Sequence, residues 1–329
     1  MRYLRPINRI SAVALACAGI CLAACATLPP AAVQERFNAA SVPYRISQAG
    51  HFIIDVSING DTALPFIIDS GATVSVLYAD TAETAGLIAD SNEIFVAGLI
   101  AIGQRKTVSN VTVTVGDKSV DLDRIAILET SNTPNGAAGL LGTDFLSDYS
   151  VLFNRDAKEA SFIDGETIDR SAFSGWSRIA LQTRLRGYDD LGLYFAQTKL
   201  ENIEAPVLID IGSDTNFVNW SLAEMDNEIR RLRRRLDRAV KLEGAVGTTK
   251  IRMQTQFHEV DLGLQRWSDI PIVIMDFDTL ADVAPVESPM MVAGAGMFSD
   301  RTFAFDFAGN AIYIYPEKAR GNAVIKPDT

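Results

Sequence analysis

Two stretches of this chain share one pattern, an apolar strand that ends in Asp-x-Gly. The first is FIIDSGA at residues 66–72 and the second is VLIDIGS at residues 207–213, so Asp69 aligns with Asp210. Three more pairs of segments align in the same order: FVAG (95–98) with KLEG (241–244), VTVTVGDKSVDLDRIAIL (111–128) with FHEVDLGLQRWSDIPIVIM (257–275), and GTDFLSDYSVLFN (142–154) with GAGMFSDRTFAFD (294–306). Unrelated segments would rarely keep this order, so the sequence predicts an internal duplication.

Alternation of apolar and polar residues dominates both copies and predicts an all-β fold. We expect two similar, closed β-barrel-like lobes with a few short helices, over residues 44–170 and 171–318, followed by a tail at 319–329. The segment SLAEMDNEIRRLRRRLDRAV (221–240) is an exception. Ser221 and Glu224 form a capping-box pattern, and apolar residues recur at a spacing of three or four, which predicts one longer amphipathic helix in the second lobe.

The first 25 residues have the pattern of an export signal. Three arginines precede the apolar stretch ISAVALACAGICLAA (10–24), which is too short for a comfortable membrane span, and LAAC ends at Cys25. An ordinary signal peptide is the alternative, but the order resembles a bacterial lipoprotein signal. That resemblance implies removal of residues 1–24 and acylation of Cys25. Because Ala26 follows, it also implies an anchor in the outer membrane, facing the periplasm.

Residues 25–43 have no sustained periodicity and contain three prolines, so they are predicted to be a tether that lifts the domain off the membrane. The formal net charge of −11 argues against nucleic acid as a partner, because its binding needs an excess of Lys and Arg. Cys17 and Cys21 leave with the signal, so the mature chain has neither a disulfide nor a cysteine nucleophile.

Composition also excludes several kinds of catalytic site. The chain has two histidines, His51 and His258, and neither lies near a Gly-flanked serine or an acidic cluster in the sequence. A Ser-His-Asp triad and a zinc site therefore have no support, and there is no phosphate-binding loop. Two aspartates in apolar strands remain. Two carboxyls a few ångströms apart cannot both ionise readily, so one can act as a base and the other as an acid on a shared water.

These residues resemble the aspartic peptidases, most closely the bacterial retropepsin-like group. The family has apolar-apolar-Asp-Thr/Ser-Gly-Ala, followed in the same lobe by two apolar residues and Gly. FIIDSGA and LLG (140–142) match both parts. Over residues 44–316 the resemblance implies an acid-protease fold in a monomeric pseudo-dimer, an extended peptide or protein as the substrate, and no metal or organic cofactor. The implied site residues are catalytic Asp69 and Asp210, supporting Ser70, Gly71 and Gly212, Gly142 and Gly294 in segments that thread through the catalytic loops, and Gly98, Gly103, Gly244 and Gly247 in two flaps.

The second copy departs from this pattern. Ile211 stands where the family has Thr or Ser, and VAG (292–294) is a looser match than LLG. Asp214 is interpreted as a surface residue. The primary hypothesis is an aspartic endopeptidase. The alternatives are a binding module that has lost catalysis, a homodimer in which two copies of Asp69 pair, and a structural lipoprotein without catalysis.

Overall fold

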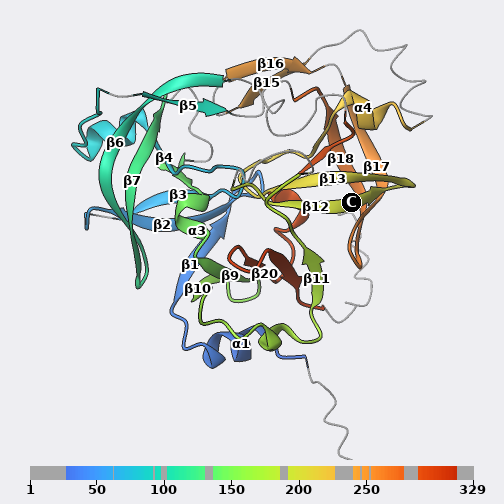
Figure 1. Cartoon of the computed structure of the whole chain (residues 1–329), viewed down its shortest axis with the longest axis horizontal. Helices are drawn as coiled ribbons and strands as arrows, with labels where there is room; N and C mark the ends of the chain where they lie inside the picture. Colours follow the sequence, from blue (N-terminus) through green and yellow to red (C-terminus); the bar gives the residue numbers. More distant parts are fainter. Residues whose placement is uncertain are drawn as a thin grey trace, which may run out of the picture.

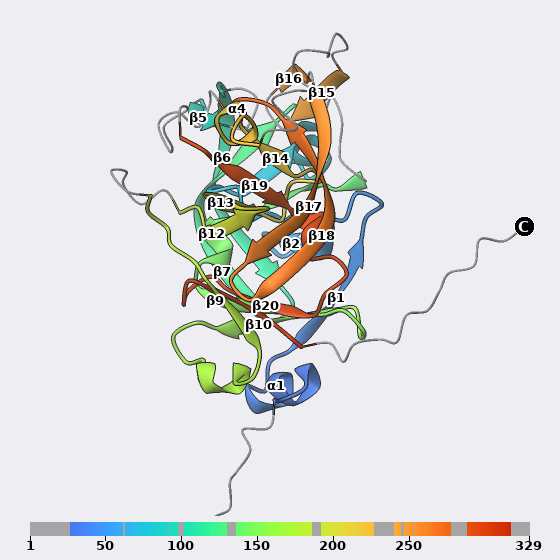
Figure 2. The ribbon, with the colours of Figure 1, turned by 90° about the vertical axis from the view of Figure 1, so that its right-hand side faces the viewer.

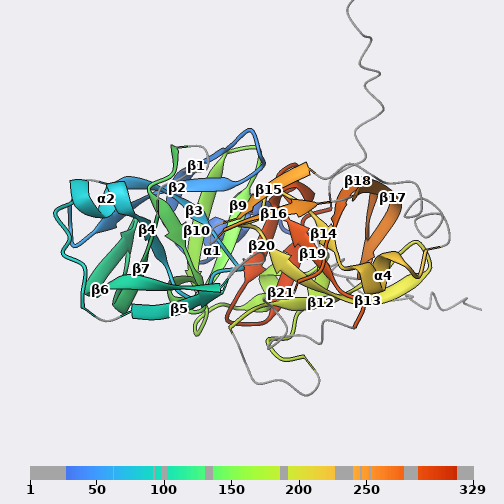
Figure 3. The same cartoon turned by 90° about the horizontal axis from the view of Figure 1, so that it is seen from above.

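The computed structural model describes residues 27–61, 63–91, 93–97, 102–129, 136–185, 192–226, 240–244, 247–251, 253–277 and 288–316. This part of the chain is mostly β, as the alternation predicts, with a few short helices (Figure 1). Its strands form a thirteen-stranded sheet, a closed six-stranded barrel and a two-stranded sheet. Seen from above, most strands of the first half of the chain lie on one side and the barrel lies on the other (Figure 3).

The thirteen-stranded sheet contains strands from both halves of the chain. The order along the sheet is β11 (Ser177–Ala180), β21 (Ala311–Ile314), β20 (Phe303–Asp306), β9 (Tyr149–Asn154), β10 (Glu159–Asp164), β1 (Ser41–Ile46), β2 (Phe52–Ile58), β3 (Leu64–Ile68), β8 (Gly139–Leu141), β4 (Val76–Tyr78), β7 (Lys118–Leu128), β6 (Ile102–Val115) and β5 (Glu93–Ala97). The end of the second half completes the sheet of the first half, because β20 pairs with β9 and sets Phe303 opposite Phe153. An additional pairing of β2 with β6 closes β2, β3, β8, β4, β7 and β6 into a ring.

The barrel is formed by the second half alone. Its strands in order are β12 (Phe195–Leu200), β13 (Ile203–Asp210), β19 (Met291–Gly294), β14 (Phe217–Val218), β18 (Gln265–Ile274) and β17 (Met253–Leu262). The two-stranded sheet consists of β15 (Val240–Gly244) and β16 (Gly247–Ile251). As whole sheets, the two halves are therefore not the similar closed barrels that the sequence predicts. The difference arises because β20, β21 and β11 of the second half extend the first sheet at the edge of β9.

One hydrophobic core joins the two halves. Phe153 of β9 stacks on Phe303 of β20 with ring centroids 4.6 Å apart, and Phe52 of β2 lies 4.7 Å from Phe153. All three rings are buried in a cluster that also contains Ile209 of β13. The position of the second half relative to the first is thus determined by shared β pairing and by aromatic packing.

The helices are short and differ in part from the predictions. They are α1 (Pro30–Arg36), α2 (Ala79–Thr84), α3 (Thr143–Leu146) and α4 (Trp220–Ala223), with 3-10 turns η2 (Arg170–Phe173) and η4 (Ala295–Met297). The predicted capping box at Ser221 is wrong, because Asn219 caps α4 by accepting a hydrogen bond from the Leu222 amide at 3.0 Å. Most of the predicted long helix, residues 227–239, lies outside the described residues. Within the described ranges no helix is long and apolar enough to cross a membrane.

The predicted tether is folded over most of its described length. Pro30 occupies the first turn of α1, where a proline is compatible with a helix start. Val33 of α1 is fully buried in a cluster with Phe173 and Trp176. Ser41–Pro43 belong to β1 and pair with β10. The three prolines suggested an irregular segment, but burial of Val33 stabilises a helix there.

Candidate active site

Asp69 follows the last residue of β3, beside the strand β8 that contains the two leucines of LLG. β3 runs parallel to β8, with Ile68 opposite Leu141. The Asp69 amide donates a hydrogen bond to the Leu141 carbonyl at 2.9 Å, which extends this pairing by one residue. The carboxyl therefore sits at the end of a buried strand whose backbone is fully paired on this side.

The loop after Asp69 wraps closely around Gly142. The Thr143 amide donates to the Ala72 carbonyl at 2.8 Å, and the Gly142 amide donates to Ser75 Oγ at 2.9 Å. A Cβ at Gly142 would lie only 2.8 Å from the Ala72 oxygen, so a larger residue does not fit. This is the threaded arrangement that the resemblance implies for Gly142.

The loop after Asp210 repeats these contacts around Gly294. β13 runs parallel to β19 and sets Asp210 opposite Gly294. The Ala295 amide donates to the Ser213 carbonyl at 2.8 Å, and the Gly294 amide donates to Asn216 Oδ1 at 2.8 Å. A Cβ at Gly294 would also lie 2.8 Å from the Ser213 oxygen. Despite its looser sequence match, VAG occupies the position that corresponds to LLG.

The two loops meet at their aspartates. A Cβ at Gly71 would lie 2.5 Å from Cγ of Asp210, and one at Gly212 would overlap the carboxyl of Asp69. Each carboxyl therefore packs against the bare backbone of the opposite Asp-x-Gly turn. A side-chain hydrogen bond joins Asp69 and Asp210, and each residue is only 8% exposed. The structure thus brings together two residues that lie 141 positions apart in the sequence.

Each carboxyl is also held by its own turn. The Gly71 amide donates to Asp69 Oδ1 at 2.8 Å, and the Gly212 amide donates to Asp210 Oδ1 at 3.0 Å. An amide that donates to a carboxylate stabilises its charged form. These two bonds fix the orientation of the carboxyls and oppose the effect of burial on their charge.

The two carboxyls differ in their affinity for a proton. Burial raises the pKa of both above the ordinary value for aspartate. The pKa of Asp210 rises well above that value, because the negative charge of Asp69 adds to the effect of burial. The hydrogen bond between them lowers the pKa of Asp69 and raises that of Asp210. The two carboxyls therefore titrate as a pair, and the direction of these shifts makes Asp210 the member that binds a proton more readily.

Ser70 and Ile211 are the unequal members of this site. Ser70 Oγ donates to the Ile209 carbonyl at 2.8 Å and accepts from the Ile211 amide at 3.0 Å, so it bridges to the opposite loop twice. Ile211 occupies the corresponding position and is fully buried in the core cluster. Its hydrocarbon side chain can make no reciprocal bond to the first loop. The departure seen in the sequence is therefore a real asymmetry of the site.

His51 is a residue of this region that the sequence analysis missed. It follows the turn between β1 and β2, is 4% exposed, and lies with Nδ1 3.4 Å from Ser47 Oγ. Its ring also hydrogen-bonds the backbone of Gly212 and lies near the exposed Asp214. Burial lowers the pKa of His51, and Asp214 and the Gly212 bond oppose this shift. The sequence analysis set His51 aside because no acidic cluster lies near it in the sequence. Its partner Gly212 is distant in the sequence, so a local search could not find this contact.

The alignment of the two copies contains the signal for His51. Gly50-His51-Phe52 corresponds to Gly192-Leu193-Tyr194. Gly50 packs near Gly296 and Gly192 packs near Thr143, so each turn approaches the segment that follows the opposite threading glycine. The turn of the first half contains His51, and the corresponding turn of the second half contains the apolar Leu193. This is a second difference between the two halves of the site, after Ser70 and Ile211.

Three of the four predicted flap glycines, Gly103, Gly244 and Gly247, lie in two hairpins beyond the aspartate pair. Gly103 pairs with Val96 between β5 and β6, and Gly244 pairs with Gly247 at the end of the β15–β16 hairpin. Both hairpins lie at the same end of the molecule in two views (Figures 1 and 2). Gly98 lies outside the described residues, so its prediction remains a prediction.

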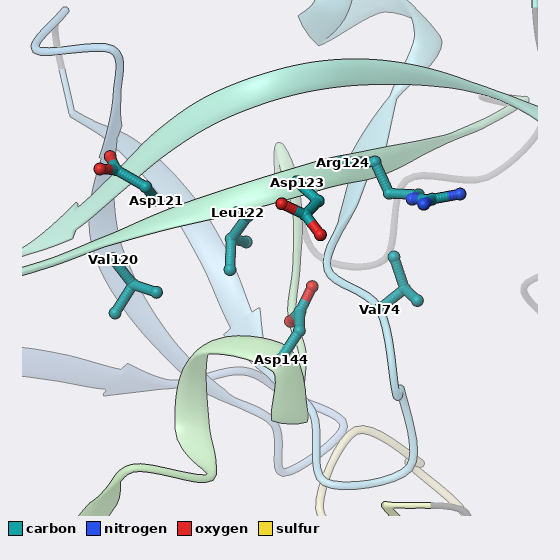
Figure 4. Close-up of a pocket in the computed structure, with 7 residues that line it drawn as sticks. All are labelled: Val74, Val120, Asp121, Leu122, Asp123, Arg124 and Asp144. Atoms are coloured by element: carbon teal, nitrogen blue, oxygen red, sulfur yellow. The ribbon is translucent and has the colours of Figure 1, made fainter.

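A pocket of about 330 Å³ lies beside the first loop but includes neither member of the aspartate pair (Figure 4). In this view Asp123 and Asp144 point toward one another. Asp144 accepts from the Ser75 amide at 2.7 Å and from Ser75 Oγ at 2.6 Å, so it braces the loop that follows Asp69. The lining residues are Val74, Val120, Asp121, Leu122, Asp123, Arg124 and Asp144.

Comparison with known proteins finds a similarity over part of the first half of the chain. Residues 54–148 match the family model described as gag-polyprotein putative aspartyl protease. The match begins within β2 and ends after α3, so it contains Asp69 and Gly142 but not Asp210. No match was found among curated proteins. Residues 54–148 are thus similar to a retropepsin-like aspartyl protease domain, which indicates a peptidase.

Proposed function

We propose that this protein is an aspartic endopeptidase that hydrolyses peptide bonds with a water activated between Asp69 and Asp210. The observation that carries the proposal is the meeting of the two buried carboxyls, each packed against the opposite Gly71 or Gly212. Their unequal affinity for a proton supplies a base and an acid in one site. The family match supports the same class of reaction for the first half.

In the proposed mechanism Asp69 is the base and Asp210 is the acid. Asp69 takes a proton from the water while the water oxygen forms a bond to the carbonyl carbon of the substrate. Asp210 gives its proton to the carbonyl oxygen, which yields a neutral tetrahedral diol. Collapse of the diol re-forms the carbonyl and breaks the C–N bond as the amine nitrogen receives the proton held by Asp69. One of the two diol hydroxyls gives its proton to Asp210 as the carbonyl re-forms, and the other remains in the carboxylic acid product. Both aspartates thus return to their starting protonation states, and no covalent enzyme intermediate forms.

We propose that the two aspartates belong to two acid-protease lobes that arose by internal duplication. Its support is the strand order β2, β3, β8, β4, β7, β6 in the first half and β12, β13, β19, β14, β18, β17 in the second. The two parallel pairings, β3 with β8 and β13 with β19, end at the two aspartates. An extended substrate would lie between this pair and the two hairpins, and would add its backbone to their strands.

We also propose that the mature protein is anchored in the outer membrane by acyl chains on Cys25 and faces the periplasm. The support is the order of arginines, apolar stretch and LAAC in residues 1–25. With a net charge of −11, the chain offers no general attraction to anionic lipids, so the acyl chains must supply the binding energy.

The direct test is cleavage of a denatured protein and of a peptide library between pH 3 and 7. Purified protein from residue 27 onward would be compared with Asp69→Asn and Asp210→Asn. Because each carboxyl transfers a proton in the reaction, each substitution should lower kcat by about 10²–10⁴-fold. Loss of cleavage in Asp69→Asn alone would contradict a shared pair. The melting temperature of each variant serves as the folding control.

The second candidate is a peptide-binding lipoprotein of the same fold without catalysis. Ile211 favours it, because one of the two bridges between the loops is missing. This candidate predicts that the wild type retains peptides but cuts none of them at any pH. A homodimer built on two copies of Asp69 has less support, since Asp210 already occupies the position opposite Asp69.

A further inference from the structure

We infer that the face formed by Thr27–Arg36 and η2, called the basal face here, lies against the lipid headgroups, with the two hairpins pointing away from the membrane. This inference rests on the proposed acylation of Cys25. It replaces the expected flexible tether with a fixed orientation, and it assigns the lipid bilayer as the partner of a surface that the catalytic site does not use.

The chain is bound to the folded body almost immediately after Cys25. Trp176 Nε1 donates to the Leu28 carbonyl at 2.9 Å, and the Thr27 side chain packs against Gly175. Gly175 has a φ of +82°, and a Cβ at this position would collide with Thr27. The segment that leads into α1 is therefore seated on the protein at its first described residue.

Contacts along α1 hold the helix to the same surface. Val33 is fully buried, and its cluster includes Phe173 of η2 and Trp176. Arg36 pairs with Asp169 and donates to Ser171 Oγ at 3.3 Å. Because α1 is held by an apolar side chain in its middle and by polar contacts at its last residue, the helix cannot swing out as a spacer without exposing buried surface.

Covalent geometry limits how far the body can move from the anchor. Only Ala26 lies between Cys25 and Thr27. Two Cα–Cα steps join these residues, so their Cα atoms can be at most about 7.6 Å apart. The headgroup layer is about 5–7 Å thick on each side of the hydrocarbon core. A body seated at Thr27 therefore touches this layer whenever the acyl chains are inserted.

The orientation follows from the opposite positions of α1 and the hairpins. In both side views α1 lies at one end of the molecule and β5, β15 and β16 lie at the other, with β13 between them (Figures 1 and 2). Figure 1 shows β3 between the two ends as well. The strands that end at Asp69 and Asp210 are thus held away from the bilayer. The proposed site would be reached from the aqueous side, by chains in the periplasm rather than by lipid-embedded segments.

The basal face has no features of a membrane-inserting surface. Its exposed charges include Glu35 and the Arg36–Asp169 pair, so there is no excess of positive charge. The large side chains Val33, Phe173 and Trp176 are buried within the body. Contact with the membrane is therefore imposed by the short connection to Cys25, and the face rests on the headgroups without entering the hydrocarbon core.

Fluorescence quenching in vesicles tests this orientation. Lipidated full-length protein would be extracted from bacterial membranes and reconstituted in vesicles of phosphatidylethanolamine and phosphatidylglycerol. Cys25 is the only cysteine of the processed chain, and its sulfur is acylated, so a second cysteine can be labelled alone. Glu35→Cys places the label on α1, and Phe95→Cys places it on the exposed face of β5. Headgroup-spin-labelled lipid should quench the first label at least twofold more than the second.

A spacer variant provides the matched control. Twenty Gly and Ser residues inserted between Ala26 and Thr27 would span about 22–27 Å on average and should remove the difference in quenching between the two labels. Equal quenching of both labels without the spacer would overturn the orientation while leaving the anchor and the peptidase intact. Failure to incorporate palmitate, or incorporation that persists in Cys25→Ala, would overturn the anchor and the orientation together. Peptide cleavage is measured separately and fails only if the proposed catalytic pair is wrong.

Discussion

The two Asp-x-Gly loops have the same backbone arrangement but unequal side chains. In both, a buried strand ends at an aspartate, a glycine receives the opposite carboxyl, and a second glycine threads through the turn. Only the first loop reaches across with a hydroxyl, from Ser70. The comparison teaches that Ser70 alone can supply the hydrogen bonds between the two loops. Ile211, at the corresponding position of the second loop, contributes apolar packing in place of a second bridge.

The largest expected effect comes from the paired glycines. Gly71→Ala and Gly212→Ala each place a methyl group inside the opposite carboxyl, so one aspartate must move. We expect a loss of activity of at least about 100-fold, because a misplacement of about 1 Å can have such an effect. Overpacking should also lower the free energy of unfolding by about 1–3 kcal/mol.

Measurement of kcat and of urea denaturation tests whether the two loops are equivalent. Gly60→Ala is a useful control, because nothing lies within 4 Å of a Cβ there, although its φ of +81° adds backbone strain. A large effect of Gly71→Ala with none of Gly212→Ala would show that the second loop does not press on Asp69.

The next effect concerns pH. The folded-state pKa of Asp210 is raised above its unfolded value, so its contribution to stability is fully present at acid pH and declines as pH rises through the folded pKa. Asp210→Asn removes this titration. We expect the melting temperature of the wild type to fall more steeply than that of the variant between weakly acid and alkaline pH.

Thermal melts across this range check which carboxyl binds a proton more readily. If Asp69→Asn flattens the profile more than Asp210→Asn does, Asp69 is the more basic member of the pair. Asp214→Asn is the control, since this exposed neighbour should leave the profile of the aspartate pair nearly unchanged.

Ser70→Ala should have a smaller but clear effect on stability. The substitution leaves the Ile211 amide and the Ile209 carbonyl without their buried side-chain partner. The expected loss is about 1–3 kcal/mol in the free energy of unfolding. Ile211→Val is the matched control at the other loop and should cost about 0.5–1.5 kcal/mol through lost packing alone. Chemical denaturation measures both, and an equal loss with no change in kcat would remove the special role of the serine bridge.

The smallest effect is expected at His51. His51→Leu copies Leu193 of the second half and removes the bond to the Gly212 backbone, whose amide orients Asp210. We expect a few-fold lower kcat with KM nearly unchanged, and a changed acid limb of the pH–rate profile. His51→Gln retains a donor and should restore part of kcat. A change in KM alone would indicate that His51 acts on the substrate rather than on the loop.

The sequence predicts the positions of the two Asp-x-Gly loops better than it predicts the sheets around them. Asp69, Asp210, Gly142 and Gly294 can be found from short strand-and-turn patterns, because their positions depend on local backbone geometry. The pairing of β20 with β9 could not be foreseen, since it depends on which edges meet after both halves have formed. The same is true of His51, whose contact with Gly212 spans 161 positions of the sequence.

The N-terminal segment teaches a related lesson about local propensity. Two consecutive prolines and the absence of periodicity favoured an irregular tether, yet Pro30 begins α1 and Val33 anchors it. Seven residues are too few for an isolated helix to be stable in water. The stability of α1 comes from Phe173 and Trp176, which lie about 140 positions away and are not part of any local pattern.

The parallel pairing of β13 with β19 has a consequence for the order in which the protein matures. The turn at Asp210 closes only when Gly294 arrives, 84 positions later in the chain, and the shared sheet is complete only with β20 and β21. Contacts of such long range form slowly, after the local hairpins. A chain that is still being synthesised therefore holds Asp69 without its partner, and the proposed activity appears only once the last strands have emerged.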